Sequence, residues 1–384
     1  MEDEQRRALR EVTRAYLSGL VDHTSTATIL ASAAQFRRGD WCAMAELGLQ
    51  GADIAQELGG AGLGQSAALL VHTEMGRALY AGPFLGTIGQ VMPGLAALGA
   101  TEPARKRLEQ IAAGELTAAA SVGTDDTTAC ESDSTDSAVT MSATGSGWQL
   151  DGQLACVTDA ELADGLLVAV PENGQVSLLW IDADTAGVQI EPLDTVDLTR
   201  RMARVSLAGA PGELLAGPAL GADSAILARQ AVAAVRQGTV LALVAECVGL
   251  AERTLEMTVE YVKSRRQFGR PIGSFQAVKH RCAELVVLLE MARSALQLAT
   301  TPASRPSEAA TRLSAARVCA GESAFAIANE AIHLHGGIGF TWEFPLHLYY
   351  RRAKSNQQLL DPDGDQRIRL AAAVAALYSE QEKI

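Results

Sequence analysis

Hydrophobic and polar residues alternate along this chain with two different periods, and the change of period divides it into three zones. In the first zone, apolar residues recur at helical spacing over residues 2–19, 67–79 and 104–113. The glycine-rich stretch Leu58–Gly64 interrupts this pattern. The spacing predicts an N-terminal helical domain over residues 1–117.

The second zone, residues 118–222, has no helical spacing. Thr, Ser, Val and Asp dominate it, and its apolar residues alternate or form brief blocks. Turn signals at Glu172-Asn-Gly174 and Ala210-Pro-Gly212 separate these runs. Short runs bounded by turns predict an all-β central domain, folded as a β-sandwich or barrel.

In the third zone, residues 223–384, the helical period returns. Asp223 is a plausible N-cap for the first helix, and Thr300–Pro306 reads as a loop between helices. The pattern predicts long helices over 226–265, 275–299 and 307–333, then shorter ones over 346–358 and 366–381. Long helices joined by short connections predict an up-down four-helix bundle, so the fold class is α+β with the domain order α, β, α.

The overall charge narrows the range of partners. The formal net charge is −13 and the isoelectric point is about 5.0, which argues against a nucleic acid or an anionic membrane as partner. No uninterrupted apolar stretch of about 20 residues has the character of a membrane helix.

Cysteine and histidine usage gives two further expectations. The six cysteines are scattered and form no CxxC pair, which is typical of reduced thiols, and the charged N-terminus does not resemble a signal peptide. We therefore expect a cytoplasmic protein. The histidines form no pair at metal-ligand spacing apart from His333 and His335, so no metal site is expected.

Two motifs near the ends of predicted helices carry the candidate chemistry. The first is Arg265-x-x-Phe268-Gly269. Its arginine suits phosphate oxygens, its phenylalanine offers a flat aromatic surface, and its glycine lets the chain turn. The second, His333-Leu-His-Gly-Gly-Ile-Gly-Phe340, offers bare backbone that a planar or anionic ligand can approach. Taken alone, such a glycine cluster is more often a helix stop.

Together, in this order and spacing, the two motifs resemble the paired FAD-binding signatures of the acyl-CoA dehydrogenase family. The resemblance covers essentially the whole chain, and the block Phe340–Lys354 continues it. It implies a fold of N-terminal helices, a central β domain and a C-terminal bundle. It also implies FAD as cofactor and an acyl-CoA as substrate.

The resemblance assigns roles to residues one by one. It implies that Arg265 reaches the FAD pyrophosphate of a neighbouring subunit, with Phe268 beside it, and that Gln276 lies near the adenine. His333 stands where the family has Gln, and Gly336 and Gly337 are retained. The plainer interpretations are that Arg265 is a solvated charge at a helix end and that His333 is structural.

The family's reaction needs a carboxylate that removes the α-proton of the acyl-CoA while a β-hydride passes to the flavin. The usual position of this base is Leu360 here, and the alternative position on the earlier helix is Thr239. The nearest carboxylates are Asp361, beside the first position, and Glu246, two helical turns beyond the second. A raised pKa would suit Glu246 to base catalysis. The plainer interpretations are a solvated or capping Asp361 and a helix-packing Glu246.

The central zone departs further from the family. The loop that contacts flavin and thioester in the family corresponds here to Val122–Thr127, which lacks its residues. In the strand that lies against the flavin ring, Cys156-Val-Thr158-Asp159 keeps Thr158 as a cofactor contact but has no large aromatic residue. Such a mixture resembles the supporting chain of actinobacterial heteromeric dehydrogenases of steroid-CoA thioesters, as does the phrase Leu198-Thr-Arg-Arg201.

Three functions therefore compete. The first is a subunit of an acyl-CoA dehydrogenase, in an α2β2 assembly with a sister subunit or in a homo-oligomer, that delivers electrons to an electron-transfer acceptor. The second is a flavin-dependent monooxygenase of the same fold. The third is a flavin-free scaffold that binds acyl-CoA. Co-purification of yellow flavin and the uptake of oxygen would separate them.

Overall fold

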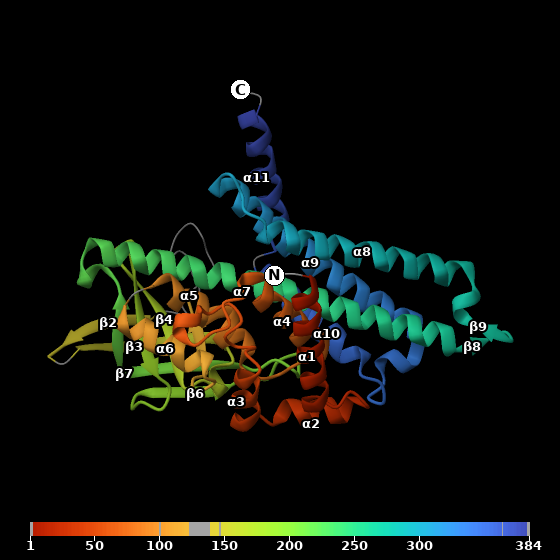
Figure 1. Ribbon diagram of the computed structural model, residues 1–384, viewed down its shortest axis with the longest axis horizontal. Coiled ribbons are helices and arrows are strands. Elements are labelled where there is room, and N and C mark those ends of the chain that lie inside the picture. The colour runs from red at the N-terminus through yellow and green to blue at the C-terminus, as the bar shows by residue number, and fades with distance from the viewer. Residues whose placement is uncertain (1–2, 100, 123–138, 146, 363, 382–384) are drawn as a thin grey trace.

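The computed structural model describes residues 3–99, 101–122, 139–145, 147–362 and 364–381. Three groups of elements follow one another along the chain (Figure 1). The first group is helical: α1 (Asp3–Leu20), α2 (Thr26–Ala34), α3 (Arg38–Glu46), η1 (Gln56–Leu58), α4 (Gln65–Ala78), the π-helical η2 (Leu85–Val91), α5 (Met92–Ala97) and α6 (Glu102–Ala112).

Local chemistry explains the start of α2, a helix that the apolar spacing did not predict. Ser25 is its N-cap: the Ser25 hydroxyl accepts a hydrogen bond from Thr28 N at 3.2 Å, and Ser25 N donates to the Thr28 hydroxyl at 3.1 Å. This reciprocal capping box satisfies two backbone groups that the first helical turn would leave unpaired.

The second group forms the central β domain. Its strands are β1 (Ala118–Ser121), β2 (Val139–Thr144), β3 (Gly147–Thr158), β4 (Gly165–Glu172), β5 (Gln175–Asp182), β6 (Val188–Pro192) and β7 (Met202–Ala216). Their order is β1-β4-β5-β7-β3-β2, with β6 also paired to β7. Among the described strands only the β1–β4 pair is parallel, and the described elements between these two in sequence are β2, β3 and the short 3-10 helix η3 (Ala160–Leu162).

The long strand β7 holds this domain together. It pairs with β5 at its C-terminal end and with β3 and β6 along the rest of its length. The sheet therefore folds around β7, and its two arms enclose an apolar core that includes Leu150, Val168, Leu179 and Val205, all fully buried. The prediction of a β-sandwich-like domain is confirmed.

The third group is the C-terminal helical domain. It consists of α7 (Ala222–Ser264), the hairpin strands β8 (Arg266–Gln267) and β9 (Arg270–Pro271), α8 (Gln276–Thr300), α9 (Pro306–His335), η6 (Gly336–Phe340), α10 (Leu346–Leu360) and α11 (Gln366–Gln381). α7 to α10 pack as the predicted bundle, whereas α11 stands off the body (Figure 1).

α7 is the spine of the molecule, since it runs through both the body and the bundle (Figure 1). By length and composition it is the one helix among the described residues that could cross a membrane, but 67% of its most apolar window is buried inside the fold. It has the position of a core helix.

Two glycines let α4 approach α7 closely. A Cβ on Gly249 of α7 would lie 1.7 Å from the carbonyl oxygen of Thr73, and one on Gly76 of α4 would lie 2.3 Å from that of Glu246. Real atoms do not approach so closely, so both positions exclude any side chain. The crossing thereby fixes the N-terminal domain to the bundle at the level of Glu246.

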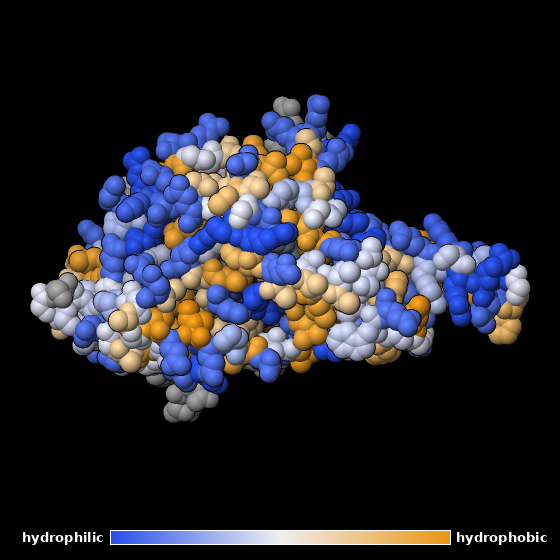
Figure 2. All heavy atoms as spheres, turned by 90° about the horizontal axis from the view of Figure 1, so that it is seen from below, coloured by the Kyte–Doolittle hydropathy of each residue, from blue (hydrophilic) through white to orange (hydrophobic). Residues whose placement is uncertain are grey.

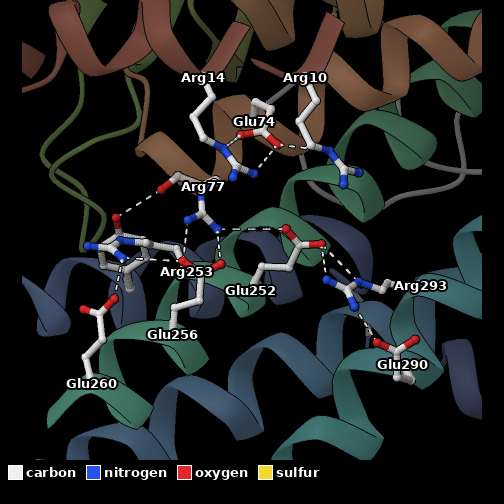
Figure 3. A network of polar contacts seen from close by, with 11 residues as sticks. Arg10, Arg14, Glu74, Arg77, Glu252, Arg253, Glu256, Glu260, Glu290 and Arg293 are labelled. Carbon is white, nitrogen blue, oxygen red and sulfur yellow. Dashed lines mark hydrogen bonds and ion pairs between the residues drawn. The ribbon is translucent and has the colours of Figure 1, made fainter. Parts of the chain in front are cut away.

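A balanced network of arginines and glutamates ties the same helices together beside this crossing (Figure 3). Glu74 of α4, only 1% exposed, accepts a hydrogen bond from Arg14 of α1 at 2.8 Å. Glu252 of α7 is contacted by Arg293 of α8 at 2.6 Å and lies 4.0 Å from Arg77 of α4. The helices α1, α4, α7 and α8 are therefore connected by charge as well as by apolar packing.

The α4–α7 crossing gives a stability prediction. Gly249→Ala is expected to lower the free energy of unfolding by about 3 kcal/mol or more, because the new methyl group cannot fit without separating the helices. The matched control is Gly19→Ala in α1, where a Cβ meets nothing within 4 Å. This control should be neutral or stabilising by up to about 1 kcal/mol. Urea unfolding measures both, and equal effects of the two substitutions would contradict the account.

Candidate functional site

The first motif lies at the free end of the bundle, where α7 stops. Arg265 is the C-cap of α7, and its backbone N donates to Tyr261 O at 2.8 Å. The chain then reverses in the β8–β9 hairpin, with Phe268 at φ 50° and Gly269 at φ 76°. A left-handed phenylalanine is uncommon and costly. The turn leaves the Phe268 side chain 91% exposed.

The second motif reaches the same end from α9. The ring of Tyr261 stacks on that of His335 with centroids 4.3 Å apart, and the Tyr261 hydroxyl donates to the His335 carbonyl oxygen at 3.2 Å. The His335 Nδ1 lies 2.7 Å from the Ala331 carbonyl oxygen. These contacts hold the two motifs together at one tip of the molecule, although they are far apart in sequence.

The glycines of the second motif present open backbone. Gly336 has φ 65°, and a Cβ at either Gly336 or Gly337 would meet nothing within 4 Å. Both residues are exposed, although the Gly336 N–H already donates to the His333 and Ile332 carbonyl oxygens as the C-cap of α9. Gly339, in contrast, is buried, with its Cβ position 3.1 Å from the Ile332 carbonyl oxygen. Its role is packing.

The other predicted cofactor residues divide between this tip and the β domain. Gln276 begins α8 at the tip and is exposed, and its side-chain nitrogen lies 3.3 Å from His280 Nε2. The His333 side chain is 85% exposed and lies 3.9 Å from Glu330. Thr158 is buried at the end of β3, and its hydroxyl donates to the Met202 sulfur at 3.4 Å. The tip projects far from the β domain (Figures 1 and 2).

Of the two carboxylate candidates, Glu246 lies in the interior, where the three domains meet. It sits on α7 and is 3% exposed. Its Oε2 accepts a hydrogen bond from Arg200 Nη2, and the same Arg200 nitrogen donates to Asn356 Oδ1 at 2.9 Å. The candidate base is therefore one half of a buried ion pair.

A second arginine completes this cluster. Arg352 of α10 is 1% exposed, and its Nε donates to Asp197 Oδ2 at 2.6 Å. Its Nη2 donates to both the carbonyl and the hydroxyl oxygen of Thr199, and its Nη1 lies 3.7 Å from Glu246. The loop 193–201 of the β domain is thereby bound to α7 and α10. We call Asp197, Arg200, Glu246, Arg352 and Asn356 the buried charge cluster.

The environment makes Glu246 a weak base. Burial raises the pKa of its carboxyl group, but Arg200 and Arg352 favour the charged form more strongly, so the pKa lies below its ordinary value. The raised pKa that would suit Glu246 to base catalysis is therefore not found, because these arginines stabilise the carboxylate. A carboxylate whose charge is neutralised by arginines gains little by accepting a proton.

Asp159 adjoins the buried charge cluster and joins η2 to the sheet. It has φ 61° at the end of β3, and its Oδ2 accepts a hydrogen bond from Gly86 N at 2.9 Å. Burial raises its pKa to about 6, against the opposing effect of Arg200. This contact closes the N-terminal domain onto the β domain.

Asp361 has a structural role at the end of α10. It is partly exposed, and its Oδ1 accepts a hydrogen bond from Gln366 N at 3.2 Å, where α11 begins. Leu360, at the family's usual base position, is 1% exposed and packs against α9 near Gly321. The carboxylate of Asp361 therefore caps a helix, and the leucine before it belongs to the bundle core.

Little space remains between these groups. The cavity that Glu246, Arg200, Asp159, Tyr80 and Phe84 line has a volume of about 10 Å³, which suits about one water molecule. Neither an acyl chain nor a flavin ring fits there in this conformation. Of the Val122–Thr127 loop, only Val122 lies within the described residues.

The buried charge cluster was not predicted from the sequence, although one signal was available. Arg352 shares the apolar face of α10 with Tyr349, Ala353 and Leu360, all buried. A charge on an apolar helix face needs a buried partner. Within the described residues, no group of three or more His, Cys, Asp or Glu side chains could hold a metal ion.

Comparison with known proteins identifies the fold. The family description "Acyl-CoA dehydrogenase, N-terminal domain" matches residues 3–115, and "Acyl-CoA dehydrogenase, C-terminal domain" matches residues 237–374. The chain is 34% identical to acyl-CoA dehydrogenase IpdE2 of Mycobacterium tuberculosis over 362 residues, which is 93% of each protein. It belongs to the acyl-CoA dehydrogenase family.

Solved structures of this family superpose on the whole chain. A steroid acyl-CoA dehydrogenase, Tcur3481–Tcur3483, matches with a TM-score of 0.80 and 26% identity, over 98% of this chain and 99% of the other. The ChsE4–ChsE5 complex from Mycobacterium tuberculosis matches with a TM-score of 0.80 and 24% identity, over 98% of both chains, which shows the shared fold.

Members of this family are FAD-binding flavoproteins, and the tip of the bundle fits one end of such a cofactor. The exposed guanidinium of Arg265 suits a diphosphate, and Gly336 and Gly337 allow it to approach the backbone closely. The cavity of about 10 Å³ beside Asp159 does not fit a flavin ring. The tip therefore fits one end of the cofactor, whereas this cavity does not fit the other end.

The raised pKa of Asp159 gives a pH prediction. The folded protein holds this proton more tightly than the unfolded chain, so the associated stability is complete below about pH 4 and is lost as the pH rises through about 6. Asp159→Asn keeps an acceptor for Gly86 N and removes the buried charge. We expect it to stabilise the protein by about 1–3 kcal/mol at pH 7.5 and to have little effect near pH 4, as measured by urea unfolding. A substitution that destabilises equally at both values would contradict this.

Proposed function

We propose that this chain is the supporting subunit of an acyl-CoA dehydrogenase. Its tip holds the adenosine diphosphate end of an FAD whose flavin ring lies on a sister subunit, and that subunit carries the catalytic base. The observation that carries this proposal is the pairing of Glu246 with Arg200 and Arg352 in a cleft that has almost no free volume.

The exposed tip supports the sharing of a cofactor. Phe268 of the first motif is 91% exposed, and Phe340 and Trp342, at and just after the end of the second motif, are 71% and 59% exposed. Large aromatic side chains seldom remain so exposed unless a partner or ligand covers them. Aromatic and arginine side chains together are typical of the centres of interfaces.

The bundle offers further surface for assembly. The outward face of α8 exposes Val287, Met291 and Leu298, and α11 exposes Ile368 at 72% and Val374 at 37%. A helix that exposes apolar residues along much of its length is normally buried against something. Two structures with this fold are, by their names, two-chain assemblies. We therefore propose an α2β2 heterotetramer with a sister acyl-CoA dehydrogenase subunit.

The relatives suggest the substrate class. IpdE2 is named an acyl-CoA dehydrogenase, and Tcur3481–Tcur3483 is named a steroid acyl-CoA dehydrogenase. We propose α,β-desaturation of an acyl-CoA derived from a steroid or related lipid, with an electron-transfer protein as acceptor, in the cytoplasm. FAD, when bound, accepts the hydride from the β-carbon.

The residues of this chain would contribute binding and orientation. Arg265 neutralises charge on the diphosphate, Gln276 offers a side-chain amide to the adenine end, and Gly336 and Gly337, which lack a Cβ, let the cofactor approach the backbone. A proton acceptor near the substrate is absent from this set. General-base assistance is worth about 10²–10⁴ in rate, so it must come from the sister subunit.

A flavin-free scaffold is the second candidate, because the closed cleft favours it. It predicts that no flavin accompanies the chain even in its assembled complex. A flavin-dependent monooxygenase would consume oxygen in place of an electron acceptor. Flavin spectra and oxygen uptake of the co-expressed complex distinguish both candidates from the proposed function.

The first test concerns the tip. Arg265→Ala removes a charge-assisted contact worth about 1.5–3 kcal/mol, so the dissociation constant of FAD from the co-expressed complex should rise roughly 10- to 100-fold. The matched control, Arg229→Ala, changes an exposed arginine at the other end of α7 and should leave it unchanged. Equal flavin affinity in both variants would contradict the role of Arg265.

The second test concerns the base. We expect the isolated chain to carry little flavin and acyl-CoA substrates to leave it unreacted under anaerobic conditions, whereas the complex is bleached by its substrate. Asp361→Asn should leave the rate of flavin bleaching by the complex unchanged. Its effect should be limited to the stability of the start of α11, where Asp361 accepts a hydrogen bond from Gln366 N. Full bleaching of the isolated chain, abolished by Asp361→Asn, would overturn the proposal and identify the base.

A further inference from the structure

A cavity of about 250 Å³ lies outside both the tip and the buried charge cluster. It is enclosed by the end of α1, by α2 and by the segment Leu79–Gly82, on the face of the molecule that carries α2 (Figures 1 and 2). Several hydrophobic patches lie on this face, separated by hydrophilic side chains (Figure 2). Nothing in the proposed function uses this cavity.

The floor of the cavity is apolar. Val21, Ile29 and Leu79 line it and are at most 5% exposed, and Leu20 and Phe36 add partly buried surface. These residues belong to two separate parts of the N-terminal domain, so the floor is a product of the tertiary fold. Its size and lining suit a compact ring system.

Three polar groups at the rim already have partners. The Asp22 carboxylate accepts a hydrogen bond from Thr24 N at 2.9 Å, the Ser32 hydroxyl donates to the Thr28 carbonyl oxygen at 2.9 Å, and Arg37 pairs with Asp40 at 2.8 Å. These three groups therefore do not require a hydrogen-bonding or charged group on a ligand. Its two carboxylates disfavour an anion.

The hydroxyl of Tyr80, unlike these rim groups, is free to bond a ligand. The backbone N of Tyr80 donates to the Met75 carbonyl oxygen at 3.0 Å and its backbone carbonyl accepts from Arg352 Nη2 at 3.4 Å, whereas the hydroxyl has no hydrogen-bond partner among the described residues. The side chain folds over Gly82, where a Cβ would lie 2.2 Å from the hydroxyl oxygen. Burial raises the pKa of Tyr80 far above its usual range, so the phenol is neutral and can both donate and accept.

We propose that this cavity binds a small, neutral, mostly apolar ring compound that carries one carbonyl or hydroxyl oxygen. The rings occupy the floor formed by Val21, Ile29 and Leu79, and the oxygen forms a hydrogen bond with the Tyr80 hydroxyl. The site is independent of the cofactor tip, so it stands or falls separately from the proposed function.

Occupation of the cavity also affects the interior. Tyr80 lines both this cavity and the small one beside Glu246, and its carbonyl contacts Arg352. A ligand that fixes the segment Leu79–Gly82 therefore stabilises the closed arrangement around the buried charge cluster. Because it binds only the folded chain, it raises the unfolding temperature.

The test compares 1-indanone with indane, which has the same rings but no oxygen. Each is titrated into the full chain, and the methyl resonances of Ile29 and Leu79 are followed by NMR. We expect both compounds to shift these resonances and 1-indanone to bind several times more tightly. Tyr80→Phe should weaken 1-indanone about fivefold, as the loss of one neutral hydrogen bond predicts, and leave indane unchanged.

A second pair of variants checks the location. Ala31 lines the cavity, whereas Ala27, one helical turn earlier on α2, is exposed and lies outside it. Ala31→Phe should abolish the binding of both compounds, and Ala27→Phe should leave it intact. The proposal is overturned if neither compound shifts the two methyl groups, if Tyr80→Phe weakens both compounds equally, or if Ala27→Phe and Ala31→Phe have the same effect.

Discussion

The ion pair between Arg200 and Glu246 is the interaction on which the rest of this structure depends. Arg200 comes from the β domain, Glu246 from the spine helix α7, and Arg352 beside them from α10. Charges withdrawn from water are tolerated only when each finds an opposite partner, and removal of one partner typically costs about 3–5 kcal/mol. The cluster therefore fixes the relative positions of the domains, and the glycine-mediated crossing of α4 and α7 brings the N-terminal domain to the same point.

The same cluster is the basis of our proposal that this chain is a supporting subunit. It occupies the interior beside β3 and leaves about 10 Å³ free, while the cofactor-binding motifs at the distant tip remain open and exposed. Under the proposed function, such a chain gains activity only beside a partner that holds the flavin ring and the base. The exposed aromatic residues of the tip and the apolar face of α8 are consistent with such a partner.

Much of the fold could be predicted because the long helices carry clear apolar periodicity and the β domain carries clear turn signals. α2 was missed because its start depends on a local capping box, and η2 because a π-helix has no simple apolar period. The positions of the motif residues at the tip follow from helix ends. The ion pair of Glu246 with Arg200 could not be predicted from the sequence, since Arg200 lies in a loop whose contacts depend on the tertiary fold.

The most direct test of the central claim is the rate at which substrate reduces the flavin of the assembled complex when Glu246 is replaced by Gln. The amide keeps an acceptor for Arg200, and the mass of the complex confirms assembly. If Glu246 serves only as an ion-pair partner, the single-turnover rate of flavin bleaching will stay within about twofold of the unmodified complex. A fall of 10² or more, the scale of lost general-base catalysis, would show that Glu246 is the base and contradict the account.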